Sequence, residues 1–247
     1  MTNTPNIEAH PSPAGTAEVG HTHSDVSGGW LRAGVFGAMD GLVTNIALVA
    51  GVGGAGASVH VIVLSGMASL VAGAFSMALG EYTSVGTQNA AVHAEAAVER
   101  AELEHNPAAE QAELVQMYRD MGLSEKTAVQ VAEEIHANPD LAIRVHLTQE
   151  LGIDPDEQPS PSVAAGSSFL SFAVGAVVPL LPFFAGLHSL WTGLGVGAVG
   201  LFLAGLIVAR FTHRSWWWSG LRQLLFGAIA AAASYGVGAL IGVSAAG

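Results

Sequence analysis

Acidic side chains recur at helical spacing in the middle of the 247-residue chain. Glu95, Glu99 and Glu102 are separated by four and then three residues, and Glu110 and Glu113 by three. Residues at these spacings share one face of a helix, where like charges repel by roughly 0.2–0.5 kcal/mol per pair. Carboxylates on neighbouring helices can share a divalent cation such as Mn²⁺ or Fe²⁺. The spacing alone fits such a metal site and an acidic, solvated helix face equally well.

A histidine and a further glutamate stand one helical turn apart near the end of this region, at His146 and Glu150. Glu133-x-x-His136 has the spacing of a ferritin-like di-iron ligand pair. That fold needs two such pairs, and the sequence has one, so we interpret this segment as an ordinary amphipathic helix.

Three potential ligands lie within strongly apolar segments. Asp40 is an isolated carboxylate in such a segment. Placing a charged side chain at the centre of a bilayer costs about 3 kcal/mol, so a carboxylate there indicates a function. Met77 and Glu81 stand one turn apart, and a thioether with a carboxylate suits a borderline ion such as Fe²⁺. The alternatives are that Met77 packs in the core and that Glu81 lies at the membrane interface.

The composition identifies the elements that must position these residues. Hydrophobic residues make up 51% and charged residues 11%, against about 25% charged in a soluble domain. The chain has no cysteine, which excludes thiolate metal chemistry, and its net charge of −12 disfavours nucleic-acid binding. Stretches without Asp, Glu, Lys or Arg predict five membrane spans of about 20 residues each. Their expected ranges are Trp30–Ala50, His60–Tyr82, Ser167–Leu187, Leu190–Ala209 and Gly220–Val243.

The region between the second and third spans is expected to be a helical module. The second span has no stop signal before Asn106, so its helix is predicted to continue out of the bilayer. Asn106-Pro107, Ser124 and Asn138-Pro139 are signals for the start of three further helices. We therefore divide the chain into a mobile tail (1–29), spans 1–2 (30–89), a cytoplasmic acidic metal-binding module (90–157) and spans 3–5 (158–247).

The basic residues predict the orientation. With a cytoplasmic N-terminus, all eight Lys and Arg residues fall on the cytoplasmic side, as the positive-inside rule expects. The N-terminal tail shows no signal peptide, and its His10, His21 and His23 fit a disordered tail better than a metal site.

Several motifs resemble those of the vacuolar iron transporter family, which includes yeast-type vacuolar iron and manganese carriers and nodulin-like proteins. They are Asp40-Gly-Leu-Val-Thr-Asn, Ser76-Met-Ala-Leu-Gly-Glu-Tyr-Thr-Ser-Val and Val178-Pro-Leu-Leu-Pro-Phe. The resemblance implies a homodimer of five-span protomers that exports Fe²⁺, and often Mn²⁺, from the cytosol in exchange for protons. It implies that Asp40 and Met77 form the membrane metal site. It also implies that the module binds metal through a set of glutamates. That set is Glu99, Glu102, Glu110, Glu113 and Glu150. The family often has Met and a further acid just before the last of them, whereas this chain has Val145-His-Leu-Thr-Gln, so either His146 substitutes or that ligand is missing.

Two functions follow from this reading. The first is a carrier of Fe²⁺ or Mn²⁺, located in the plasma membrane of a prokaryote or the vacuolar membrane of a eukaryote. The second is a membrane-anchored metal sensor or partner-binding protein without transport. An enzyme is not expected, because the sequence has no phosphate-binding loop and no nucleophile motif, and no organic cofactor is expected. The expected fold is an all-α membrane protein with five transmembrane helices per protomer and a cytoplasmic helical module.

Overall fold

The computed structural model describes residues 29–154, 158–212 and 215–245, and the regular structure in these ranges is helical. Five helical segments are long and apolar enough to cross a membrane, which confirms the predicted architecture. These segments are α1 (Gly29–Gly54), the first part of α2 (Val59–His105), α6 to α7 (Pro161–Phe184), α8 (Leu190–Thr212) and α9 (Trp216–Ala245). The tail expected over residues 1–29 and its three histidines lie outside the described residues, apart from Gly29.

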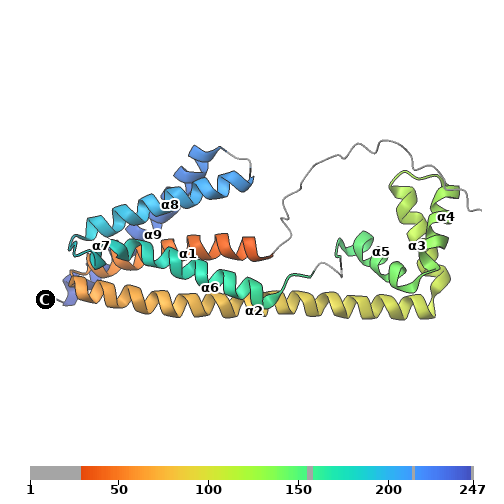
Figure 1. The fold of residues 1–247 in the computed structure, drawn as a ribbon, viewed down its shortest axis with the longest axis horizontal. Helices are drawn as coiled ribbons and strands as arrows, with labels where there is room; N and C mark the ends of the chain where they lie inside the picture. The colour runs from red at the N-terminus through yellow and green to blue at the C-terminus, as the bar shows by residue number, and fades with distance from the viewer. Residues whose placement is uncertain (1–28, 155–157, 213–214, 246–247) are drawn as a thin grey trace, which may run out of the picture.

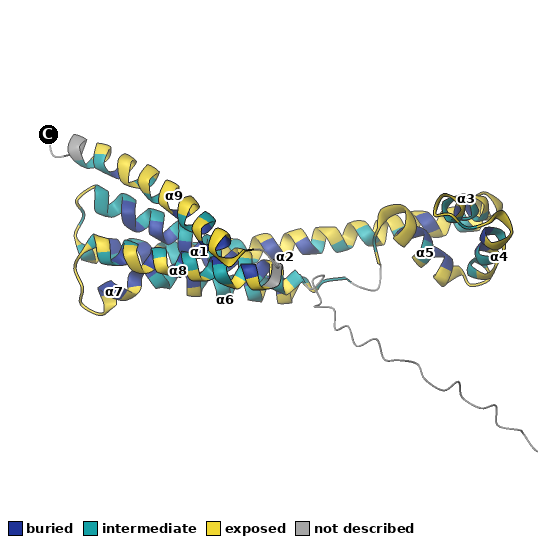
Figure 2. Cartoon of the chain, turned by 90° about the horizontal axis from the view of Figure 1, so that it is seen from above, coloured by how far each residue is buried: buried dark blue, intermediate teal, exposed yellow. Residues whose placement is uncertain are grey.

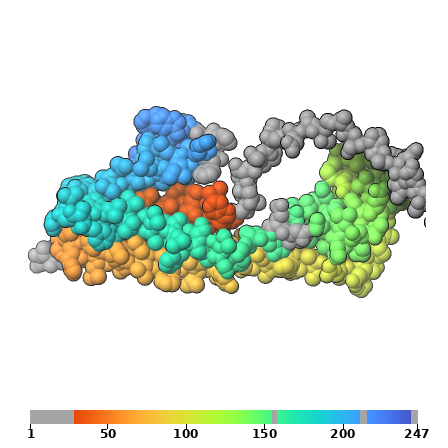
Figure 3. All heavy atoms as spheres, viewed as in Figure 1, coloured from red at the N-terminus to blue at the C-terminus, as the bar shows by residue number. Residues whose placement is uncertain are grey.

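The helix α2 runs through both parts of the molecule. It is 47 residues long, so it continues past the membrane span to His105, as predicted from the lack of a stop signal. The helices α1 and α6 pack along its first half, and α8 and α9 pack against α1 and each other. The helices α3, α4 and α5 gather at the far end of α2 (Figure 1). The space-filling view shows the same division into a bundle and a terminal module (Figure 3).

The module consists of the end of α2 with α3 (Pro107–Asp120), α4 (Glu125–His136) and α5 (Pro139–Leu151). Ser124 and Asn138 cap α4 and α5, because their side-chain oxygens accept hydrogen bonds from the backbone N–H groups of Thr127 and Leu141. Asn106 also separates two helices, but its side chain does not cap α3. It donates instead to Glu102 Oε2 at 2.9 Å, because the residue still ends α2 and points back along that helix.

In the bundle, α1 packs closely against α6 through glycine. A Cβ atom at Gly41 would collide with the Phe172 carbonyl oxygen, and one at Gly175 would collide with the Ala38 carbonyl oxygen. Small residues of this kind let membrane helices approach at backbone distance. Fully buried Asn45 adds a polar tie, because its amide donates to Gly66 O at 3.1 Å and to Ala176 O at 2.7 Å. The first helix is thereby fixed to both α2 and α6.

The third span is broken at its prolines. The α-helix α6 ends at Val177, and Val178–Leu180 form a 3₁₀ turn, η1, before the short helix α7 (Leu181–Phe184). Pro179 has no N–H to donate to the preceding turn, which explains the change of helix type. Leu180 and Phe183 from this break join Val49 and Ile62 in a buried core cluster.

Candidate metal centre

The residues of the module that meet come from three helices. Glu99 lies on the part of α2 beyond the membrane span, and Glu110 lies in the first turn of α3. The two helices are separated by Asn106 alone, so the chain turns sharply there, and α3 rises at a steep angle from the far end of α2 (Figure 1). His146 and Glu150 lie one turn apart on α5, which packs against α2. The tight α2–α3 corner and the capped start of α5 thus place four potential ligands together.

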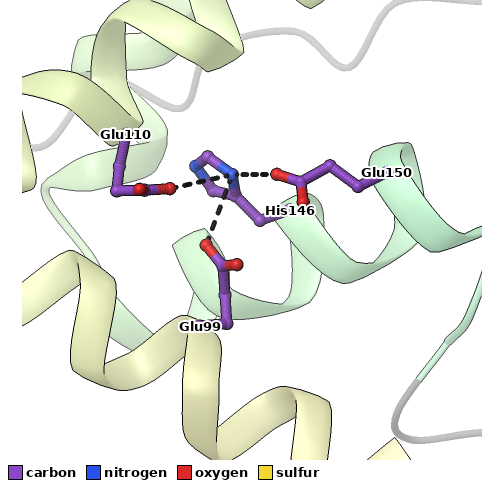
Figure 4. A group of neighbouring side chains, drawn as sticks. All are labelled: Glu99, Glu110, His146 and Glu150. Atoms are coloured by element: carbon purple, nitrogen blue, oxygen red, sulfur yellow. Dashed lines mark hydrogen bonds and ion pairs between the residues drawn. The ribbon is translucent and has the colours of Figure 1, made fainter.

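These four side chains converge on a common point (Figure 4). One ligand atom from each lies within 4.8 Å of the others, in the group Glu99, Glu110, His146 and Glu150. His146 Nδ1 lies 2.9 Å from Glu150 Oε1, 3.4 Å from Glu99 Oε1 and 3.8 Å from Glu110 Oε2. Three carboxylate oxygens and one imidazole nitrogen at these separations form a donor set suited to a borderline divalent cation. We call this group the Glu–His centre.

Burial makes the Glu–His centre unusual for an acidic cluster. The His146 side chain is fully buried, and the Glu99 and Glu110 side chains are each 12% exposed. Glu99 Oε1 is buried and makes no hydrogen bond within the described part of the chain. Its 3.4 Å approach to His146 Nδ1 is therefore an electrostatic contact and not a well-formed hydrogen bond. Solvated acidic helix faces do not place carboxylates in this way, so the geometry favours the metal-site reading of the spacing.

Burial also changes the acidity of the carboxylates. The pKa of Glu99 is raised to about 7 by burial first, with His146 opposing the rise and the neighbouring carboxylates, Glu150 first, adding to it. Burial likewise raises the pKa of Glu110, with His146 again opposing. Carboxyl groups of this kind exchange protons near neutral pH, and a cation that binds them must displace those protons.

A second histidine contacts the centre from outside. His136, in the last turn of α4, has Nε2 3.1 Å from His146 Nε2. Burial, and then the nearby His146, lowers the pKa of His136. In the sequence, His136 was considered only as part of the di-iron-like pair Glu133-x-x-His136, and the structure shows that Glu133 is exposed. The informative signal was the short turn Ala137–Asn138 between two helices, which brings the end of α4 beside α5.

The other two glutamates proposed for the module lie at the margin of the centre. Glu102 and Glu113 are exposed and do not belong to the group of four. Their charges still reach it: Glu113 raises the pKa of both Glu99 and Glu110, and Glu102 raises that of Glu110. They add negative potential beside the entry to the buried ligands.

The three ligands proposed in the membrane have different surroundings. Asp40 is half-buried on α1 and hydrogen-bonded to the Thr44 side chain one turn on. Met77 packs against the core cluster of Ala74, Phe172 and Ala176. Glu81 is nearly buried and forms an ion pair with Arg32, whose guanidinium lies 2.8 Å from Glu81 Oε2. In the single chain, Glu81 therefore joins α2 to the start of α1.

Comparison with known proteins gives a consistent result. A family model described as the VIT family matches residues 31–239. A protein of Acanthamoeba castellanii named vacuolar iron transporter is 35% identical over 237 residues, which cover 94% of this chain and 82% of that protein. Vacuolar iron transporter 1 of Oryza sativa subsp. japonica is 32% identical, with 88% of each chain covered. Vacuolar iron transporter 1 of Arabidopsis thaliana is 29% identical, with 87% of this chain and 88% of that protein covered. The similarity runs through both the bundle and the module.

Proposed function

Because the chain belongs to the VIT family, a family of transporters and not of enzymes, we propose that it carries Fe²⁺ out of the cytosol in exchange for protons. We propose that Mn²⁺ is a second substrate. The protein is a multi-pass membrane protein with five helices that can span the bilayer. The iron in this proposal comes from the names of the relatives. The export direction is what the resemblance to the vacuolar iron transporters implies, and the cytoplasmic side expected for the basic residues and the module is compatible with it.

The observation that carries the proposal is the Glu–His centre at the end of a helix that is also a membrane span. Its four ligand atoms lie within 4.8 Å of one another, and Glu99 belongs to the same helix as Met77 and Glu81. Glu99 is 18 residues beyond Glu81, which corresponds to about 27 Å along a helix. In our proposal this centre captures the hydrated ion and delivers it toward the bundle, with exposed Glu102 and Glu113 attracting it first.

Within the membrane, we propose that Asp40 and Met77 form the translocation site. A carboxylate at this depth needs a partner, and a cation provides one. Glu81 lies at the cytoplasmic end of the path, where its ion pair with Arg32 sets the local charge. Carboxylates bind either a proton or a metal ion, so the same groups can couple the two flows.

The assembly and the membrane are also part of the proposal. Large apolar side chains remain exposed along α8 and α9, and α9 is exposed over most of its length (Figure 2). Such surfaces face lipid or a second copy of the chain. We propose a homodimer, in the vacuolar membrane of a eukaryote or the plasma membrane of a prokaryote.

The proposal is tested with purified protein in liposomes whose outer face carries the module. Fe²⁺ entry is followed with a metal-sensitive dye inside. We expect Asp40→Ala to reduce entry to the level of protein-free liposomes while metal binding to the module is retained. The matched control is Asp120→Ala, which removes an exposed carboxylate that is hydrogen-bonded to Gln116 on α3.

Undiminished transport by Asp40→Ala would reject Asp40 as the translocation residue. A wild-type protein that binds metal in the module but gives no flux would instead favour the anchored sensor.

A further inference from the structure

We propose that His136 is a positioning residue that fixes the tautomer and ring orientation of His146, so that His146 Nδ1 presents its lone pair to the cation. This inference rests on the proposed function, in that it takes the Glu–His centre to bind a divalent metal. It assigns a role to a residue that is not itself a ligand.

The contact between the two rings is specific. His136 Nε2 lies 3.1 Å from His146 Nε2, and the ring centroids are 5.3 Å apart at an interplanar angle of 64°. His146 is fully buried, so neither ring nitrogen can rely on bulk water. Its Nδ1 faces three carboxylates, and its Nε2 faces His136.

The chemistry of imidazole then determines the hydrogen-bond direction. A neutral imidazole has one N–H donor and one lone pair. If Nδ1 of His146 binds a cation, its proton must sit on Nε2, and that buried N–H needs an acceptor. His136 Nε2 is at hydrogen-bonding distance, so it accepts, and the His136 proton sits on its own Nδ1.

The alternative tautomer shows why this matters. With the proton on Nδ1, His146 donates to Glu150 Oε1 at 2.9 Å and has no lone pair facing the carboxylates. The centre would then contain only oxygen ligands for a metal. By accepting from Nε2–H, His136 favours the tautomer that adds a nitrogen ligand, which suits borderline ions over Mg²⁺ or Ca²⁺.

The ring of His136 has space on its other side. It lines a pocket of about 190 Å³ together with Arg100, Leu103, Glu104 and residues at the start of α3 and α5. Side chains of similar length can therefore replace His136 without entering the Glu–His centre. This makes three substitutions informative: His136→Gln places an amide near the position of Nε2, His136→Asn places it near Nδ1, and His136→Leu removes the hydrogen bond.

The experiment titrates the full-length protein in detergent with Co²⁺ and records the visible absorption bands and the dissociation constant. We expect His136→Leu to weaken binding by about 10–100-fold and to shift the bands toward those of an all-oxygen site. His136→Gln should retain affinity within about threefold, and His136→Asn should fall between the two. The control is His105→Leu, because His105 is an exposed histidine at the end of α2 whose Nδ1 lies 2.7 Å from the Ala101 carbonyl oxygen of its own helix.

Nitrogen NMR of the His146 ring supplies a readout that a purely structural role would not change. With metal bound, we expect the proton on Nε2 in the wild type and in His136→Gln. Unchanged affinity and unchanged bands in His136→Leu would overturn the inference and leave the proposed function standing. Equal losses in Gln, Asn and Leu variants would overturn it as well. A wild type without Co²⁺ bands would overturn both.

Discussion

The Glu99 carboxylate lies in surroundings that favour its protonated form. Burial and the nearby carboxylates raise its pKa to about 7, above the 4.5 that is usual for a glutamate. Between these two values the folded, metal-free protein binds more protons at Glu99 than the unfolded chain, so this group makes folding less favourable as the pH rises. Below about pH 7 a cation must displace the proton of Glu99, whereas above about pH 7 it binds the ionised carboxylate without this competition.

The first prediction follows from this competition. The affinity of the module for Mn²⁺ should fall as the pH is lowered through about 7, and Glu99→Gln should both weaken binding and flatten this dependence. Calorimetric titration between about pH 6 and pH 8 measures it. The control is Glu95→Gln, which neutralises an exposed glutamate one turn away on α2. An unchanged pH dependence in Glu99→Gln would show that another group carries the proton competition.

The second prediction concerns His146, the nitrogen ligand. Replacing it with Leu keeps a buried side chain of similar size but removes the nitrogen ligand. We expect His146→Leu to weaken Co²⁺ and Zn²⁺ binding about tenfold more than Mn²⁺ binding, because Mn²⁺ depends less on nitrogen ligands. Competition titrations against Mn²⁺ measure the ratio. Equal losses for all three ions would indicate that His146 acts through packing and not as a ligand.

The sequence predicted which residue types would form the Glu–His centre, but it did not predict which of the candidate residues would meet there. The sequence pointed to six acidic or histidine side chains in the module, and the structure brings four of them together. Spacing does not distinguish Glu99 from Glu102, because burial depends on how α3 and α5 cover α2. His136 was missed as a partner of His146 for the same reason: the 3.1 Å contact depends on the packing of α4 against α5.

At the scale of elements, α2 connects the two parts of the proposed pathway. Near the point where it leaves the bundle, Val85 forms a buried cluster with Ala33 and Ala164. Asn89 then donates to Pro159 O at 3.0 Å, which ties α2 to the segment before α6. Beyond Asn89 the helix continues to the Glu–His centre. The rotation of the module about the α2 axis is therefore set by one continuous helix.

The third prediction tests this coupling. Inserting one alanine after Ala91 turns the module by about 100° relative to the bundle and moves it by about 1.5 Å. We expect metal binding by the module to persist while Fe²⁺ flux in liposomes falls severalfold. An insertion of seven residues, about two turns, should restore much of the flux because it nearly restores the rotation. Flux that does not respond to the single insertion would show that delivery does not depend on module orientation.

The helix boundaries were largely predictable because their causes are local. Ser124 and Asn138 cap the helices that they were expected to cap, and Pro179 interrupts the third span. The prediction that the Asn106 side chain caps α3 was wrong. Asn106 is the single residue between α2 and α3, and its side chain is hydrogen-bonded to Glu102 of the preceding helix. The close contact of Gly41 with α6 could not be predicted from the sequence. The sequence shows where small residues lie on a helix, but not which helix packs against them.

For the molecule as a whole, charge and membrane are separated along its length. Fifteen of the 20 acidic residues lie in residues 90–157, and the net charge of −12 is therefore a property of the module and tail. The bundle exposes large apolar side chains such as Trp191 and Leu203, as expected for contact with lipid or a second protomer. The five long apolar helices agree with the spans that the hydropathy of the sequence predicts.

The most direct test of the central claim measures metal and proton movement together. Liposomes with an acidic lumen and the module facing outward receive Fe²⁺ outside, and dyes inside report metal and pH. We predict Fe²⁺ entry with a simultaneous rise in lumenal pH, inhibited by Mn²⁺ and not by Ca²⁺. Fe²⁺ entry at the same rate without a pH gradient and without a lumenal pH change, or no entry at all, would contradict a proton-coupled iron exporter.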